Sequence, residues 1–314
     1  MNRSTEQLLK AVSRSFYLSI KLLPKKMRGS IGLAFLFCKF ADTIADTDLI
    51  SASERLSQLE EFRNHFLSSH RSDFSSSELS VLGGSAAERK LLESLSLLFE
   101  ELQHIEKKDQ ELITWLVPEL TQGMQVDLRY FSAEKKLTAL EHEEDLEKYI
   151  YYVAGCVGIF WSQIIQNHYS FAINWSNEVF LAAEHFGKGL QLVNVLRDFP
   201  RDLQQGRCYF PQEKLHEYKL KVEDLLDESN LEKVSPLLHY YISKARYYLG
   251  FGETYLKHLP RLAFRLRASV TLPMELGFKT LELLEEDKQW LNPKHVVKVS
   301  RGEVYRTLLS SLVR

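Results

Sequence analysis

Residues 31–46 read IGLAFLFCKFADTIAD, an apolar run that ends in two aspartates. The run Ile31 to Cys38 predicts a segment of buried helix. Asp42 and Asp46 are four residues apart, so one helix face carries both carboxylates, with their Cβ atoms about 5–6 Å apart. Two like charges so placed repel each other unless water or a cation lies between them. An acidic helix end that continues to Asp48 and a divalent-cation site are both open readings of this pair.

A second polar set follows another apolar segment much later in the chain. Asn194, Asp198 and Asp202 lie at positions i, i+4 and i+8, with Asn194 inside the segment Leu190 to Leu196 and the two aspartates after it. A repeated acidic pair is expected where two helices face each other across a cavity and hold metal-bound phosphates. Mg²⁺ fits this pattern because it prefers carboxylate, phosphate and water oxygens.

Cations lie near both acidic sets. Arg can bind phosphate oxygens with two parallel hydrogen bonds, while Lys contributes a point charge. Each cation taken alone is typical of a surface ion pair, but the clustering favours an anion site. The four residues are Lys39, Arg197, Arg201 and Arg207.

Composition limits the class of protein. The chain has 314 residues, of which 45% are apolar and 26% charged, so a disordered or low-complexity protein is excluded. With 40 basic and 42 acidic residues the net charge is −2, which predicts no nucleic-acid partner. Cys38, Cys156 and Cys208 form no Cys-x-x-Cys pair, and this indicates neither a zinc site nor a disulfide framework.

The chain shows no secretory signal and no apolar run of the roughly 18 to 20 residues that a membrane span needs. We therefore expect a cytoplasmic protein without a transmembrane segment.

Strict apolar and polar alternation is almost absent, so we predict an all-α fold in a single domain, residues 1–314. Asp109 and Ser176 are expected N-caps. The serine-rich stretch Ser68 to Ser85 is the best candidate for a mobile loop. The acidic run Glu141 to Glu147 is interpreted as a solvated helix N-terminus rather than a metal site at His142. The expected helices run over Thr5–Leu22, Arg28–Thr47, Ser53–Ser68, Ala87–Leu102, Asp109–Phe131, Glu143–Ser170, Ser176–Phe199, Ser235–Leu259 and Leu262–Glu286.

These motifs resemble the squalene/phytoene synthase family, whose members join two prenyl diphosphates head to head. The similarity runs from about residue 13 to 211 and follows the family's order. Its blocks are Ser13-Arg14-Ser15-Phe16-Tyr17, Leu23-Pro24, the motif from Asp42 to Asp46, Gly123 to Leu128, Tyr149 to Gly158, Gln191 to Asp198 with Asp202, Gly206-Arg207, and Tyr209-Phe210-Pro211.

The resemblance implies an isoprenoid-synthase-type helical bundle around one central cavity, with both acidic motifs on Mg²⁺ and diphosphate. It assigns catalytic roles to Tyr149, Asp42, Asp46, Asp198 and Asp202. The same four aspartates and Asn194 would be the metal ligands. Substrate-binding positions would be Ser13, Ser15, Phe16, Phe35, Lys39, Gln191, Asn194, Arg197 and Arg207.

Three positions depart from the family pattern. Lys39 and Phe35 stand where the family usually has Arg and Tyr, so a bidentate phosphate contact and a hydroxyl are lost. The family's second motif usually carries Glu before its last Asp, whereas this chain reads Pro200-Arg201-Asp202. Because proline removes a helical hydrogen bond and tends to kink or end a helix, we expect Asp202 to be displaced.

The implied reaction is Mg²⁺-dependent 1′-1 condensation through a cyclopropylcarbinyl diphosphate. The run Arg201 to Arg207 resembles squalene synthases at this point, and this resemblance favours two farnesyl diphosphates as substrates, giving squalene or dehydrosqualene. Phytoene synthesis from geranylgeranyl diphosphate is the alternative, and a non-catalytic scaffold or a cyclising terpene synthase are rivals. Squalene formation needs a hydride, usually from NADPH. The chain has no Gly-x-Gly-x-x-Gly motif, but its absence does not decide between squalene, dehydrosqualene and phytoene. Peripheral membrane contact for product release is a further expectation.

Overall fold

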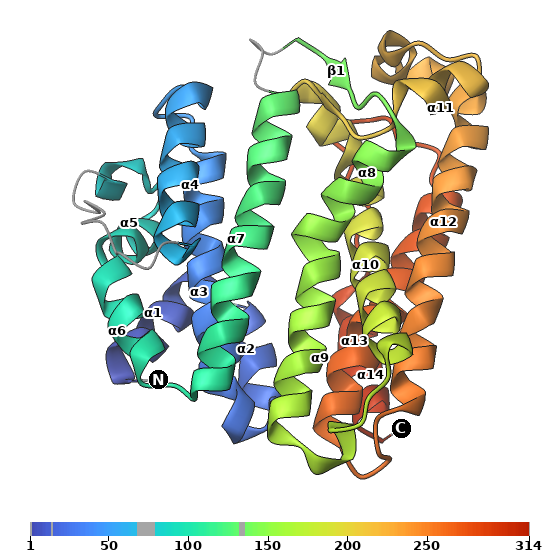
Figure 1. Cartoon of the computed structure of the whole chain (residues 1–314). Helices are drawn as coiled ribbons and strands as arrows, with labels where there is room; N and C mark the ends of the chain where they lie inside the picture. The colour runs from blue at the N-terminus through green and yellow to red at the C-terminus, as the bar shows by residue number, and fades with distance from the viewer. Residues whose placement is uncertain (1, 14, 68–78, 132–135, 314) are drawn as a thin grey trace. The chain divides into compact units, whose positions relative to one another are not determined.

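The computed structural model describes residues 2–13, 15–67, 79–131 and 136–313. Most of these residues lie in helices, which confirms the all-α prediction (Figure 1). Within the described residues the strands are β1 (Thr138–Ala139) and β2 (Arg207–Cys208), which pair in parallel. None of the helices in this described part has the length and apolarity that a bilayer crossing requires.

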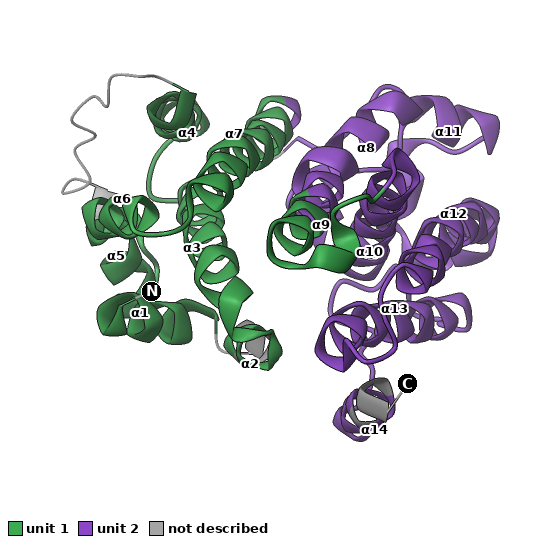
Figure 2. Cartoon of the chain, turned by 60° about the horizontal axis from the view of Figure 1, so that its bottom comes forward, with its two compact units in different colours: residues 1–129, 160–175 green, residues 130–159, 176–314 purple. Residues whose placement is uncertain are grey.

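The chain divides into two compact units that are interleaved in sequence (Figure 2). Unit 1 combines Met1–Arg129 with Phe160–Trp175, and unit 2 combines Tyr130–Ile159 with Ser176–Arg314. The boundary at residues 159 and 160 falls inside one helix, α9 (Cys156–His168). The single domain expected from the sequence stays a prediction.

Unit 1 is built around α3 (Lys25–Asp46), whose buried side chains form an aromatic core. The ring of Phe37 lies 5.1 Å from that of Phe66 and 5.0 Å from that of Phe99, and Phe40 stacks on Phe62 at 4.8 Å. Such contacts bury large apolar areas and so anchor α3. The other helices of this unit are α1 (Arg3–Ser13), α2 (Ser15–Leu22), α4 (Ala52–Leu67), η1 (Leu79–Leu82), α5 (Ala86–Glu93), α6 (Leu95–Gln103), α7 (Lys107–Tyr130), the later part of α9, and η3 (Ser170–Ala172).

Unit 2 centres on α10 (Asn177–Gln204), which packs beside α12 (Leu231–Lys257) and α13 (Phe264–Glu285). The first turns of α9 also pack on α10, because a Cβ at Gly158 would lie 2.1 Å from the Ala183 carbonyl oxygen. A side chain at residue 158 would therefore prevent this close approach of the two helices. The remaining elements are α8 (Glu143–Ile150), the π-helical turn η2 (Tyr151–Gly155), α11 (Gln212–Glu217), η4 (Val222–Leu226), η5 (Glu228–Asn230) and α14 (Arg301–Val313).

The helix boundaries correct several expectations. The helix expected over residues 5–22 is two helices, α1 and α2, and the one expected over residues 87–102 is α5 and α6. The helix expected over residues 143–170 is α8 and α9, joined by the π-helical turn. The helix expected to end at Phe199 continues to Gln204. The sequence prediction also missed α11 and α14.

Both expected N-caps behave differently from the prediction. Ser176 is the N-cap of α10 by position, but its side chain makes no capping hydrogen bond. Asp109 lies inside α7, which begins at Lys107, and is buried, so its prediction as an N-cap is wrong. Most of the serine-rich stretch, residues 68–78, lies outside the described residues, and Ser85 at its end forms a capping box with Glu88.

Candidate functional site

The first acidic pair lies at the C-terminal end of α3, in unit 1. Lys39 Nζ donates to Asp42 Oδ2 at 2.6 Å and lies 3.8 Å from Glu88 Oε1 on α5. Burial lowers the pKa of Lys39, but attraction to Asp42 and Glu88 outweighs it, and the net pKa is raised. Asp46 is exposed one turn further along. The helix end thus presents two carboxylates and a fixed cation.

The other unit 1 positions implied by the family are less informative. Phe35 is half-buried on α3, one turn before Lys39. The Ser13 hydroxyl donates to the Leu9 carbonyl within α1, which fixes that side chain against its own helix. The side chains of Ser15 and Phe16 lie outside the described residues.

The second acidic set lies on α10, in unit 2. Arg197 donates through Nε to Asp198 Oδ1 at 3.0 Å and through Nη2 to Oδ2, a bidentate pair. This hydrogen bonding raises the pKa of Arg197. Asn194 is exposed, and Asp198 and Asp202 are half-buried. The structure therefore gives Asp198 a cation partner on its own helix, as Lys39 partners Asp42.

Pro200 does not interrupt α10, so the expected displacement of Asp202 by a helix break is wrong. Proline has no N–H, which leaves the Leu196 carbonyl without its helical donor. The Trp290 indole Nε1 donates to that carbonyl at 2.8 Å in the buried core. Trp290 also stacks on Phe199, with ring centroids 4.8 Å apart and an interplanar angle of 8°. The indole thus replaces the missing donor, and Asp198 and Asp202 keep the i, i+4 relation.

The end of α10 delivers Arg207 and Tyr209. Gly206 ends the helix with φ 83°, a left-handed conformation that favours glycine, and its N–H donates to the Leu203 carbonyl. Residues 207 and 208 then pair with β1, since the Thr138 N–H donates to the Gly206 carbonyl at 3.0 Å. This short ladder fixes the direction in which the chain leaves the helix.

Tyr149, the proposed catalytic tyrosine, has two neighbours from this region of unit 2. Its ring stacks on Tyr209 with centroids 4.6 Å apart, and its hydroxyl accepts from Gln191 Nε2 at 3.4 Å. Gln191 Oε1 in turn accepts from Asn194 Nδ2 at 3.4 Å. The structure therefore brings Tyr149, Gln191 and Asn194 together, as the resemblance implied.

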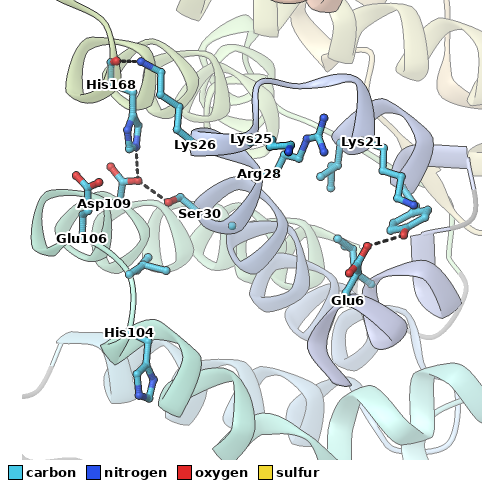
Figure 3. A pocket seen from close by; sticks show the side chains of 15 residues that line it. Glu6, Lys21, Lys25, Lys26, Arg28, Ser30, His104, Glu106, Asp109 and His168 are labelled. Atoms are coloured by element: carbon cyan, nitrogen blue, oxygen red, sulfur yellow. Dashed lines mark hydrogen bonds and ion pairs between the residues drawn. The ribbon is translucent and has the colours of Figure 1, made fainter. Parts of the chain in front are cut away.

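A pocket of about 430 Å³ lies within unit 1, and its lining includes none of the predicted site residues (Figure 3). Asp109 is buried on one wall, where its carboxylate accepts from Ser30 Oγ, from Asn167 Nδ2 at 2.9 Å and from His168 Nε2 at 2.8 Å. Ser30 contacts the carboxylate rather than the imidazole, so the arrangement is not that of a nucleophilic triad. These bonds join α3, α7 and α9, which is a structural role.

Comparison with known proteins identifies the family. The squalene/phytoene synthase family model matches residues 9–303. The chain belongs to the squalene/phytoene synthase family. Its members are prenyltransferases that condense prenyl diphosphates head to head.

Relatives within the family carry different names. The chain is 27% identical to the squalene synthase of Rattus norvegicus over 96% of its own length and 68% of the relative's. It is 29% identical to a bifunctional lycopene cyclase/phytoene synthase of Arthroderma gypseum, over 95% of this chain and 49% of that one. The solved structure of TcSQS with a ligand superposes with a TM-score of 0.79 at 25% identity, covering 99% of this chain and 85% of that chain. Squalene and phytoene synthases match at similar identity, so the product stays open.

The donor sets suit the divalent metal on which the squalene/phytoene synthase family depends. The described residues contain no group of three or more His, Cys, Asp or Glu that could hold a metal within one cluster. Each acidic motif supplies two carboxylates at i, i+4. Mg²⁺ keeps several waters and is bound by one or two carboxylates together with substrate phosphates, so a complete protein cage is not required. Paired hard oxygens fit that chemistry.

Sequence reasoning missed a charged network in unit 2. Lys244 on α12 bonds to Glu143 and, at 2.6 Å, to Glu147 on α8, while Lys188 on α10 lies 3.6 Å from Glu147 and 2.8 Å from Glu184. The side chains of Glu143 and Glu147 are only 20% and 25% exposed, so the solvated helix N-terminus was wrong for these two acids. His142 pairs with Glu213 at 3.1 Å. The i, i+4 spacing of Glu143 with Glu147 was the available signal.

Proposed function

We propose that this chain catalyses the Mg²⁺-dependent 1′-1 condensation of two farnesyl diphosphates, through a cyclopropylcarbinyl diphosphate, to squalene or dehydrosqualene. The observation that carries the proposal is the pair of i, i+4 aspartate motifs, each with its own cation, on two helices of a squalene/phytoene synthase. A non-catalytic scaffold would not need four carboxylates at metal-ligand spacing. The preference for the C15 substrate rests on the resemblance of the run from Arg201 to Arg207 to squalene synthases.

In this proposal the acidic motifs hold the diphosphate end of the substrates. Asp42 and Asp46 would provide one set of metal ligands, and Asn194, Asp198 and Asp202 the other. When bound, Mg²⁺ neutralises the diphosphate and so makes it a better leaving group from an allylic carbon. Lys39, Arg197 and Arg207 add positive charge that binds and orients the same diphosphates.

Tyr149 and Tyr209 act on the hydrocarbon end. Aromatic faces attract cations, so the stacked pair stabilises the allylic carbocation while apolar walls exclude water. Gln191 holds the Tyr149 hydroxyl. A tyrosine is a weak base near neutral pH. The released diphosphate is therefore as good a candidate as the Tyr149 hydroxyl for accepting the proton that the reaction releases.

The remaining parts of the proposal concern context. One domain, residues 1–314, is supported by a single family match that spans both interleaved units. A cytoplasmic location is supported by Cys38, Cys156 and Cys208, which lie in the described part of the chain and form no disulfide there. A C30 hydrocarbon partitions into bilayers, so peripheral membrane contact for product release belongs to the proposal, as does NADPH for a squalene product.

Product analysis tests the proposal. The purified chain is incubated with Mg²⁺ and either farnesyl or geranylgeranyl diphosphate, each with and without NADPH. We expect a C30 product from farnesyl diphosphate, and loss of that product in Asp42→Asn. A C40 product formed only from geranylgeranyl diphosphate would replace the C15 assignment with phytoene synthesis, the function favoured by the Arthroderma relative. No product from either substrate would favour the scaffold.

A further inference from the structure

The turn between α12 and α13 exposes large apolar side chains. Leu262 is 93% exposed and Phe264 is 50% exposed. The turn itself lies at the lower end of α12 in Figure 1. Burying such side chains is favourable by roughly 1.5–3 kcal/mol each, so their exposure gains nothing for the fold itself. We call residues 257–267 the α12–α13 turn.

The same turn is strongly basic in an acidic chain. It contains Lys257, Arg261, Arg265 and Arg267, and the sequence holds no aspartate or glutamate from residue 254 to residue 274. Lys257, Arg261 and Arg265 are exposed. Two exposed acids lie at this end of unit 2. Glu253 is one turn before Lys257 on α12, and Glu178 is in the first turn of α10, which runs antiparallel to α12 with Gly189 against Leu249 and Phe186 against Gly252.

Helix stability does not account for these cations. The N-terminus of a helix carries a partial positive charge, which disfavours basic side chains in the first turn. Arg265 and Arg267 nevertheless lie in the first turn of α13, which has no acid there and whose N-cap, Ala263, offers no side-chain acceptor. Free N–H groups at this terminus add to the attraction for an anion.

Arg267 has a separate role in shaping the turn. Its Nη1 donates to the carbonyls of Leu256 at 2.9 Å and Leu259 at 3.0 Å, which closes the end of α12 over the start of α13. The Ala263 N–H donates to the Pro260 carbonyl at 2.9 Å. The turn is thus held in one conformation with Leu262 outward.

We propose that the α12–α13 turn docks on the surface of an anionic lipid bilayer, with Leu262 and Phe264 in the acyl boundary and Lys257, Arg261 and Arg265 on the headgroups. Apolar side chains beside basic ones match a surface that is apolar inside and negative at its face. Its use, the transfer of a hydrocarbon product, rests on the proposed function, whereas the binding itself does not.

Co-sedimentation of the full chain with vesicles tests the docking. We expect binding to vesicles that contain phosphatidylglycerol, much weaker binding to pure phosphatidylcholine, and loss of binding as salt is raised. Each basic residue near an anionic surface strengthens binding about five-fold, so Arg261→Gln with Arg265→Gln should weaken it by roughly twenty-five-fold. Leu262→Ser with Phe264→Ser should weaken it by at least about ten-fold.

Matched controls come from elsewhere in unit 2. Leu226→Ser removes an exposed leucine, and Lys288→Gln with Lys294→Gln removes two exposed cations beyond the other end of α13. Both controls should bind like the parent chain, and unchanged thermal unfolding verifies that each variant is folded. Absent binding to phosphatidylglycerol, or equal loss in the controls, overturns the proposal.

Two further outcomes separate rival explanations. If the parent chain self-associates in sedimentation equilibrium and only the Leu262 and Phe264 variant is monomeric, the turn joins two copies and the lipid proposal is wrong. Product assays without vesicles are scored separately. If the chain makes product but does not bind vesicles, the proposed function stands and the docking proposal is wrong. If it binds vesicles through this turn but makes no product, the docking proposal stands and the proposed function is wrong.

Discussion

Lys39 stands where the family pattern usually has Arg, so the positive charge is kept and the bidentate contact is lost. Its ammonium is already hydrogen-bonded to Asp42 and near Glu88. A diphosphate would therefore meet a cation that is positioned by two acids, but without the fork of an arginine.

We expect Lys39→Ala to raise KM for the prenyl diphosphate about ten-fold or more, because a charge-assisted contact contributes roughly 1.5–3 kcal/mol. Lys39→Arg should keep or increase kcat/KM. Steady-state kinetics on both variants measures this, with the exposed Lys90→Ala on α5 as the control. Unchanged constants in Lys39→Ala would remove Lys39 from the site.

Asp198 and Asp202 should now matter about equally, contrary to what Pro200 alone suggests. The continuous α10 keeps both carboxylates on one face, so Asp198→Asn and Asp202→Asn should each reduce kcat by about two orders of magnitude or more and raise the Mg²⁺ concentration needed for half-maximal rate. Mg²⁺ titrations of turnover test the pair. A much milder effect at residue 202 would show that only Asp198 is a ligand.

Much of the candidate site was predictable at the residue scale, because i, i+4 spacing of acids depends only on helical geometry. The partner of a site residue was not predictable when it came from far along the chain. Tyr209 against Tyr149 and Trp290 against Leu196 are such contacts. The periodicity of a short segment carries no information about which distant side chain will donate to an unpaired carbonyl.

Among the elements, α10 depends on a contact outside itself. An interior proline costs a helix about 3 kcal/mol, and the indole of Trp290 recovers part of this by serving the Leu196 carbonyl. The sequence prediction ended the helix at Phe199 because proline was weighed against local propensity alone. Pro118, Pro236 and Pro273 also lie inside helices.

A double-mutant cycle tests whether the Trp290 indole N–H replaces the missing N–H of residue 200 as the donor to the Leu196 carbonyl. Trp290→Phe keeps the stacked ring but leaves a buried carbonyl unpaired, which should lower the free energy of unfolding by about 1–3 kcal/mol. In the Pro200→Ala background the restored N–H serves Leu196, so the same change should cost about 1 kcal/mol less. Urea unfolding measures all four proteins. Pro236→Ala, at an exposed proline inside α12, is the matched control background, in which we expect the effects of Pro236→Ala and Trp290→Phe on the free energy of unfolding to add. If the effects of Pro200→Ala and Trp290→Phe also add, Trp290 does not replace the donor that is missing at Pro200.

The bridge between α8 and α12 is the second test at this scale. Lys244 has a side chain only 16% exposed between two glutamates, so Lys244→Met should destabilise the protein by about 3 kcal/mol. Lys148→Met, which removes an exposed i, i+4 pair with Glu144, should cost less than about 1 kcal/mol.

The same bridge predicts a pH dependence. Burial raises the pKa of Glu147, but the hydrogen bonds from Lys244 and Tyr248 lower it by more than burial raises it, so the net pKa lies below the ordinary 4.5. A lowered pKa contributes stability that is present above pH 4.5 and is lost as the pH falls through the folded value. The parent chain should therefore lose more stability than Lys244→Met between pH 5 and pH 3 in thermal unfolding. Parallel pH profiles would contradict this.

At the scale of the whole molecule, the interleaved units limit where the chain can be divided. Unit 1 needs residues 160–175, because the buried Asp109 accepts from Asn167 and His168. A fragment of residues 1–129 should therefore lack cooperative unfolding, while residues 1–175, which contain all of unit 1, should regain it. Near-ultraviolet circular dichroism during thermal unfolding compares them. Equal cooperativity in both fragments would show that the later segment is dispensable.

The interleaving also sets an order of events during synthesis. Residues 130–159 leave the ribosome before residues 160–175, yet they belong to the unit whose remaining 139 residues, Ser176–Arg314, are translated last. The nascent chain can close unit 1 only after the segment 130–159 has emerged without its own partners. That segment carries the apolar start of α9, so it is exposed to chaperones for as long as translation of the remainder takes.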